Sequence, residues 1–192
     1  MLGFFTNYLL ILMIITGHNQ ISCEDVDLYW RDYNGTIPSD AYPAGNDIYI
    51  GQTLNLPHMQ EGGLLPGGLY PDRRKLIVEA HGKRQEHNNN IKVLCTSTPY
   101  LLKWRWINTR DLKSKLCENC IVGGYEVERL LFIGKIFHDG EWKIGKVFPP
   151  SNEGPSRNGL RIWTKDGIAF SAEDFQILMS VNQTELCNEC HI

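Results

Sequence analysis

The chain carries the same succession of sequence elements twice. Each copy has a small residue and a glycine before an acidic residue, then an aliphatic-aromatic stretch ending in glycine, then a Gly-x-aliphatic-aromatic-Pro segment and a final short apolar stretch. These elements occupy residues 41–47, 48–51, 65–71 and 91–94 in the first copy, and 120–126, 131–135, 144–149 and 175–178 in the second. A unit of roughly 80 residues present twice is too long for a solenoid repeat. We therefore expect one compact domain whose two related halves complete a common core.

The N-terminus has the features of a secretory signal peptide. Residues 9–15 form an apolar run that is too short to span a bilayer, and a polar stretch follows it. A membrane anchor is the alternative interpretation. We assign residues 1–23 to a signal peptide and predict a secreted, extracellular protein without a membrane span. Two N-glycosylation sequons, at Asn34 and Asn182, agree with this prediction.

The remaining chain is long enough for one domain with its own core. We place the first repeat at residues 24–103, the second at 104–180, and a cysteine-containing tail at 181–192. The formal net charge of −3 and the pI near 6.1 give no electrostatic footprint for nucleic acid, so we expect no nucleic-acid partner.

Short strands separated by turns dominate the pattern. Glycine pairs at 62–63, 67–68 and 123–124 and Asp-Gly steps at 139–140 and 166–167 predict turns. The strands are predicted at 48–50, 76–79, 91–95, 101–107, 130–136, 143–147, 160–164 and 174–179. The only helix-like stretch is 109–116. This pattern predicts an all-β architecture.

Five cysteines lie beyond the signal peptide, and four of them form two CxxC pairs. In an oxidising compartment, these four are expected to form two disulfides that tie the tail to the linker between the halves. A four-thiolate zinc site and redox activity are the alternatives. The four cysteines are Cys117, Cys120, Cys187 and Cys190. The fifth, Cys95, follows an apolar strand and is interpreted as a buried, inert thiol.

Two tryptophans, Trp104 and Trp106, alternate with Lys103 and Arg105 in one predicted strand. Such alternation places both indoles on one face of the strand. We expect this face to belong to the core, and a platform on which a sugar ring stacks is the alternative.

The order of these motifs resembles the DM-nine repeat, which occurs as a tandem pair in invertebrate proteins. The resemblance covers about residues 29–180 and is carried by the stretches 45–51, 65–67, 91–94, 123–126, 131–135, 144–147 and 175–178. It implies a non-catalytic, all-β tandem domain. Family members include mannose-binding lectins of innate immunity, in which an acid and a lysine contact the sugar.

Carried onto this chain, the resemblance gives three carbohydrate-binding candidates. The acid corresponds to Asp47 in the first copy and to Glu126 in the second, and the lysine corresponds to Lys146 in the second copy. The first copy has Gly68 at the position of the lysine. A carboxylate accepts hydrogen bonds from adjacent sugar hydroxyls and an ammonium donates to them. The alternative is that these acids cap turns or pair with a lysine; since the candidates adjoin glycines, we expect their truncation to cost little stability.

No catalytic or phosphate-binding motif occurs in the sequence, and the six histidines have no partnered arrangement. We therefore predict no enzymatic activity, no cofactor and no metal. The predicted function is recognition of carbohydrate, mannose or a related glycan, in innate immunity or pathogen response, with a homodimer as a possible assembly. The alternative is a disulfide-stabilised extracellular protein-interaction module whose sugar site has decayed.

Overall fold

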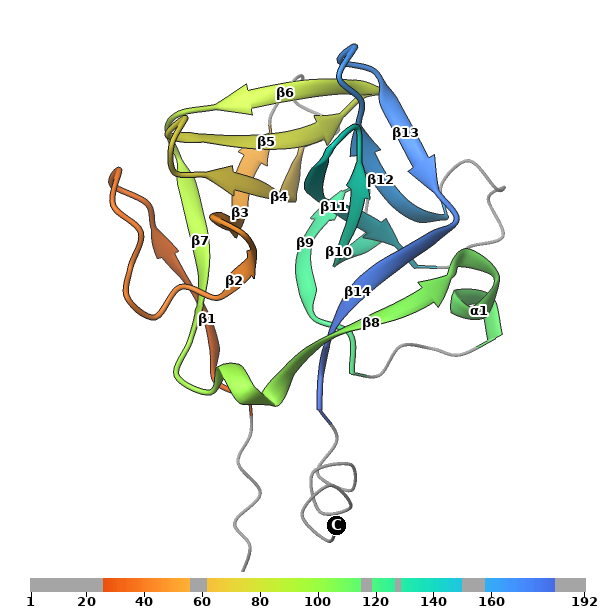
Figure 1. The fold of residues 1–192 in the computed structure, drawn as a ribbon, viewed down its shortest axis with the longest axis horizontal. Helices are drawn as coiled ribbons and strands as arrows, with labels where there is room; N and C mark the ends of the chain where they lie inside the picture. The colour runs from red at the N-terminus through yellow and green to blue at the C-terminus, as the bar shows by residue number, and fades with distance from the viewer. Residues whose placement is uncertain (1–25, 56–61, 115–118, 127–128, 150–157, 182–192) are drawn as a thin grey trace, which may run out of the picture.

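The computed structural model describes residues 26–55, 62–114, 119–126, 129–149 and 158–181 (Figure 1). The described chain forms a single 14-stranded antiparallel sheet that coils on itself, with one short α-helix and one 3₁₀ turn. The predicted all-β class is therefore confirmed. The signal-peptide residues and the C-terminal tail beyond Val181 lie outside the described residues.

The first half of the chain contributes seven strands: β1 (Leu28–Asp32), β2 (Pro43–Gly45), β3 (Ile48–Asn55), β4 (Gly63–Tyr70), β5 (Lys75–Ala80), β6 (Lys83–His87) and β7 (Ile91–Thr96). After the 3₁₀ turn η1 (Pro99–Leu101), the second half contributes β8 (Leu102–Asn108), α1 (Thr109–Ser114), β9 (Val122–Glu126), β10 (Arg129–His138), β11 (Glu141–Phe148), β12 (Gly159–Trp163), β13 (Ala169–Ala172) and β14 (Asp174–Ser180).

The two halves use the same scheme of strand pairing. In the first half the pairs are β1·β7, β2·β3, β3·β4, β3·β7, β4·β5 and β5·β6. In the second half they are β8·β14, β9·β10, β10·β11, β10·β14, β11·β12 and β12·β13. The same correspondence extends to two isolated bridges, Ala41 with Cys95 and Cys120 with Met179. Positions on the paired strands of one half can therefore be compared with positions on those of the other.

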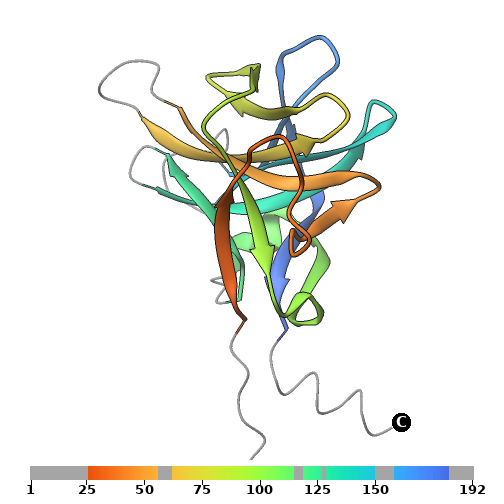
Figure 2. The same cartoon turned by 90° about the vertical axis from the view of Figure 1, so that its left-hand side faces the viewer.

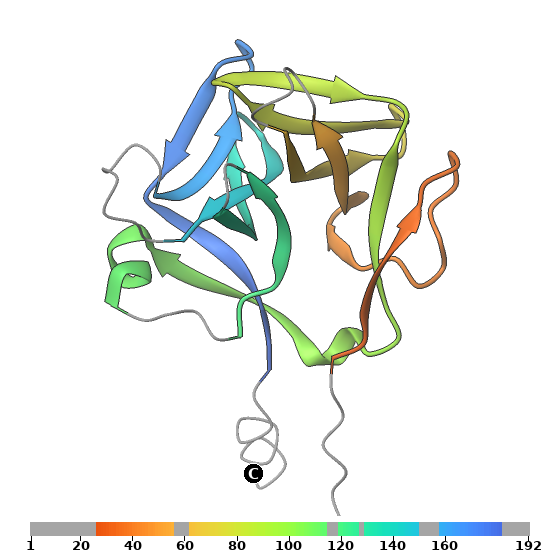
Figure 3. The same ribbon diagram turned by 180° about the vertical axis from the view of Figure 1, so that it is seen from behind.

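The halves join at two places, and together these junctions close a ring of strands. On one side β4 pairs with β9 through Gly63 and Leu64. On the other side, β6 meets the start of β13 through the bridge between Lys83 and Ile168, at the top of Figure 1. Outside the ring, β8 and β14 run side by side along the lower edge of the second half (Figures 1 and 3). The described chain begins and ends on the same side of the molecule (Figure 2).

A reciprocal pair of hydrogen bonds also connects the halves. The Gln52 amide nitrogen donates to the Gly123 carbonyl at 2.6 Å, and the Lys135 Nζ donates to the Ala44 carbonyl at 2.6 Å. Gln52 and Lys135 occupy equivalent positions, because each follows the glycine that pairs with the neighbouring strand of its own half. Gln52 of the first half thus binds β9, the strand before β10, and Lys135 of the second half binds β2, the strand before β3.

The core between the halves is apolar and contains side chains from both. Its buried members are Tyr42, Ala44, Ile48, Ile50, Tyr70, Ile77 and Leu94 from the first half and Leu102, Ile121, Ile133, Ile144, Trp163 and Leu178 from the second. A second cluster lies mainly in the first half but also contains Leu131 and Phe148 of the second, and a third lies in the second half. Since neither half could bury the shared cluster alone, hydrophobic burial favours the joined state.

The structure corrects the interpretation of two glycine pairs. The prediction of turns at 67–68 and 123–124 is wrong, because these glycines lie within β4 and β9. A Cβ on Gly67 would lie 2.3 Å from the Ile77 carbonyl oxygen, and one on Gly124 would lie 1.8 Å from that of Leu64. These glycines allow close approach of neighbouring backbones, whereas the Asp139–Gly140 step forms the predicted hairpin turn with positive φ at both residues.

Candidate functional site

Two carboxylates and one ammonium group meet where the halves join. The Lys146 Nζ donates to a Glu126 carboxylate oxygen at 2.6 Å and lies 3.1 Å from a Glu79 carboxylate oxygen. The side chains are 4% exposed for Lys146, 3% for Glu79 and 11% for Glu126. Because two negative groups surround one positive group at short range with little water, the attraction within this charged cluster is strong.

Three strands position the members of the charged cluster. Lys146 lies on β11 of the second half, Glu126 ends β9, and Glu79 lies on β5 of the first half. The other Glu79 oxygen accepts a hydrogen bond from the Gly82 amide at 2.8 Å, which fixes this carboxylate against the turn that follows β5. Glu126 is the least buried of the three and forms the edge of the cluster nearest to solvent.

Polar and aromatic side chains border the Glu126 edge. In the strand register, Asn55, Gly63, Glu126 and Arg129 form one row across β3, β4, β9 and β10. Residues directly opposite one another in antiparallel strands project from the same face of the sheet. The Arg129 guanidinium stacks on the Phe148 ring, 5.2 Å from its centroid, and donates to the Pro149 carbonyl. The site thus combines hydrogen-bond acceptors, hydrogen-bond donors and an aromatic ring.

The structure brings together two of the three predicted sugar-binding residues. Glu126 and Lys146 are in direct contact, whereas Asp47 lies in the exposed turn between β2 and β3, where its φ is 51°. Lys146 lies within the predicted strand 143–147, but the expectation that its truncation costs little stability does not fit its place, because its side chain is buried in β11. Its truncation therefore removes a buried counter-charge, which is costly.

The related place, formed by Gly68 of the first half and Trp163 of the second half, has different residues. The pairing scheme places Gly68 at the position of Lys146 and Trp163 at the position of Glu79. A Cβ on Gly68 would lie 2.9 Å from the Tyr70 ring, so this ring fills the space that a longer side chain would use. A buried lysine without its carboxylate would be unfavourable, which explains why both charges are missing together.

The sequence profile of the DM9 repeat matches residues 42–154, which is more than half of the chain and includes all three members of the charged cluster. The chain belongs to the DM9 repeat family. This confirms the family that the motif order resembles. No curated protein matches this chain.

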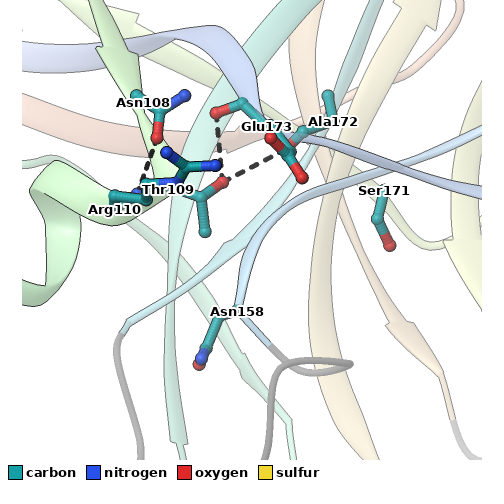
Figure 4. A pocket seen from close by; sticks show the side chains of 7 residues that line it. All are labelled: Asn108, Thr109, Arg110, Asn158, Ser171, Ala172 and Glu173. Carbon is teal, nitrogen blue, oxygen red and sulfur yellow. Dashed lines mark hydrogen bonds between the residues drawn. The ribbon is translucent and has the colours of Figure 1, made fainter.

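A separate hollow lies on the second half of this DM9 repeat protein (Figure 4). It measures about 320 Å³ and is lined by Asn108, Thr109, Arg110, Asn158, Ser171, Ala172 and Glu173. Polar groups of its wall already bond to one another: the Thr109 hydroxyl bonds the carbonyls of Ala172 and Glu173, and the Arg110 amide donates to Asn108. None of these residues belongs to the charged cluster, so the hollow is a different place on the molecule.

The cysteine predictions fall partly outside the described residues. Cys120 is disulfide-bonded, while Cys117, Cys187 and Cys190 lie outside the described part of the chain, so the pairing remains a prediction. Cys95 is a buried free thiol, and burial raises its pKa to about 11. Within the described ranges, no three His, Cys, Asp or Glu side chains are grouped to hold a metal ion.

Of the two predicted glycosylation sites, one lies within the described residues and the other does not. The Asn34 side chain is exposed, and its amide oxygen accepts a hydrogen bond from the Thr36 amide at 3.2 Å, in a turn that a glycan could occupy. Asn182 lies outside the described residues. In the part of the chain that the structure describes, no helix is long and apolar enough to cross a membrane.

Sequence reasoning missed one member of the cluster, Glu79. It ends a predicted strand of otherwise apolar residues, Leu76 to Val78, and its neighbours are buried. The sequence signal that could have identified Glu79 is a charged residue within an apolar strand, because such a residue needs a buried partner. The sequence does not show that the partner is Lys146, which belongs to the other half.

Proposed function

We propose that this DM9 repeat protein is a secreted, non-catalytic recognition protein that binds a mannose-type carbohydrate at the charged cluster. The DM9 repeat family is known generally for lectin-like carbohydrate binding. The observation that carries the proposal is the direct contact between Lys146 and Glu126, the acid and the lysine that the family resemblance assigns to sugar binding.

The cluster has the hydrogen-bonding capacity for a polyol. An ammonium has three donors, and the two carboxylates use two of them, so the proposal assigns the third donor of the 4% exposed Lys146 side chain to a sugar hydroxyl. The Glu126 carboxylate, at the solvent edge, accepts from a second hydroxyl. Glu79, held by the Gly82 amide, fixes the position of Lys146 and does not need to touch the sugar. A few charge-assisted hydrogen bonds of about 1.5–3 kcal/mol each give weak monovalent binding.

The proposal includes one such site per chain. At the related place, Gly68 of the first half and Trp163 of the second half stand where the ammonium and the buried carboxylate would be, and the Tyr70 ring fills the space beside Gly68. Asp47 remains as an exposed acid without the rest of the arrangement. Secretion, glycosylation at Asn34 and a role in pathogen response belong to the same proposal.

Calorimetry with methyl mannoside tests the proposal. We expect a stoichiometry of one sugar per chain and an affinity that falls about ten- to a hundredfold in Glu126→Gln, because one charge-assisted contact is lost. Asp72→Asn, which changes an exposed acid outside the cluster, is the matched control. Undiminished affinity in folded Glu126→Gln would exclude the cluster, and an equal loss in Asp47→Asn would show that the first half also binds.

A second candidate is a protein-interaction module, and an exposed apolar row favours it. Leu54, Leu64, Tyr125 and Leu130 face one another across β3, β4, β9 and β10, and three of them are about half exposed. Contiguous exposed apolar side chains often mark a binding surface. Capture of one extracellular protein by the wild-type chain, lost in Tyr125→Ser and unaffected by competing sugar, would support this candidate over the lectin.

A further inference from the structure

A strip of aromatic side chains crosses the sheet of the second half, away from the charged cluster. Two of its rings are exposed: Trp106 on β8 is 60% exposed, and Phe137 on β10 is 57% exposed. The half-buried indoles of Trp104, also on β8, and of Trp142, opposite Phe137 on β11, complete the strip. Large aromatic surfaces are unfavourable in water, so such a strip indicates a binding surface.

The strand register places these side chains on one face. Gln176 of β14 lies opposite Trp106 on one side and opposite Lys135 on the other, so these three side chains project from the same face. Phe137 follows Lys135 by two residues on β10 without a bulge, and therefore shares this face.

The half-buried rings of the strip are held rigidly. The Lys135 Nζ lies 4.3 Å from the centroid of the Trp104 ring and 5.0 Å from that of Trp142, and it donates to the Ala44 carbonyl. Phe137 contacts Trp142 edge-to-face at a centroid distance of 5.7 Å. The cation and the rings thus fix one another, and their preorganisation lowers the entropic cost of binding.

We infer that this strip is a second glycan-binding surface, on which sugar rings of a neutral oligosaccharide chain stack. This inference rests on the proposed carbohydrate-binding function. A pyranose has an apolar C–H face and a rim of hydroxyls, and the strip offers rings together with the Gln176 amide. The Asn108 amide, bonded to Asp174 at 2.7 Å, adds polar groups beside Trp106. The ammonium in the middle is already satisfied, which disfavours a charged partner.

The dimensions of the strip fit a chain of sugars. Trp106 and Phe137 are separated by two strand spacings of ~4.8 Å and one two-residue step of ~6.7 Å, which places them about 12 Å apart. A monosaccharide cannot reach both rings, whereas an oligosaccharide can. The strip should therefore bind an oligosaccharide more tightly than a monosaccharide, while the charged cluster binds a single sugar unit.

The test compares methyl mannoside with a linear mannose oligosaccharide by calorimetry on the full secreted chain. The variants are Glu126→Gln, the double variant Trp106→Ala/Phe137→Ala, and the control Ile168→Ala, which removes an equally exposed apolar side chain elsewhere. We expect the double variant to lose about tenfold or more in oligosaccharide affinity and nothing in methyl mannoside affinity. We expect Glu126→Gln to retain oligosaccharide binding at the strip, and the control to match the wild type.

Three results would overturn the inference. Unchanged oligosaccharide affinity in the folded double variant would do so. An equal loss of both ligands in Glu126→Gln would show that all glycan binds at the charged cluster, so the proposed function would stand without the strip. Ring-dependent binding to neutral phospholipid vesicles, without glycan binding, would assign the strip to a membrane surface. Conversely, ring-dependent oligosaccharide binding without any methyl mannoside binding would support the strip and refute the cluster.

Discussion

Replacing Lys146 by methionine should destabilise the protein strongly, although its position beside a glycine in the sequence suggested only a small loss of stability. Methionine keeps the aliphatic stem but leaves the Glu79 and Glu126 carboxylates buried without a cation. Breaking a buried ion pair in this way costs about 3–5 kcal/mol. The free energy of unfolding of a domain is about 5–15 kcal/mol, so the loss is a large share of the total.

Urea denaturation followed by tryptophan fluorescence measures this loss. With a denaturant slope of about 2 kcal/mol per molar, a loss of about 4 kcal/mol lowers the unfolding midpoint by about 2 M. The matched control is the triple variant Glu79→Gln, Glu126→Gln, Lys146→Met, which removes all three charges and keeps the shapes. We expect the triple variant to recover most of the stability, because no uncompensated charge remains.

The same measurement can refute the reasoning. A midpoint only about 0.5 M below the wild type in Lys146→Met would mean that water reaches the cluster and screens the carboxylates. A triple variant as unstable as the single one would show that shape, and not charge, holds this junction together.

Four further predictions follow from particular side chains. Gly68→Lys should lower the free energy of unfolding by about 1–3 kcal/mol and create no sugar site, because its Cβ meets the buried Tyr70 ring; a gain in calorimetric affinity would contradict this. Burial lowers the pKa of Lys135 from its ordinary 10.5 to about 8, so between these values the unfolded chain binds more protons and stability should rise with pH. Urea midpoints from pH 7 to 9.5 should show this rise, and a slope that persists in Lys135→Met would assign it to another group. Cys95 should be the single titratable thiol of the secreted protein, reacting only after denaturation; four more thiols released with zinc by a chelator would establish the metal site instead. Secreted protein should lack about 23 N-terminal residues and carry glycan at Asn34, so an uncleaved intracellular product would contradict secretion.

The apolar strands were predictable from the sequence, and the glycine-rich and charged ones were not. The stretches 91–95 and 174–179 lie within β7 and β14, because their β-branched and aromatic residues favour extended backbone. The Gly-Pro-rich β4 and the Lys-Arg-rich β6 are strands only because neighbouring backbones pair with them. Local propensity carries no information about such pairing partners.

Two of the three members of the charged cluster were predictable from the sequence. Glu126 and Lys146 follow from the family motifs, and the structure places them in contact. Glu79 lies in the other half of the chain and joins them only because β5 faces β11 in the closed ring of strands. The aromatic strip also depends on strand register, since Phe137 and Trp106 are far apart in the sequence.

The sequence by itself determined the all-β class and the family, because repeated motifs and residue periodicity are local properties. The tertiary structure decided which charges are buried together and which rings share a face. It also decided that the lysine position of the first half is filled by Tyr70. These outcomes depend on contacts between residues distant in sequence, where close packing and the cost of burying an unpaired charge select the arrangement.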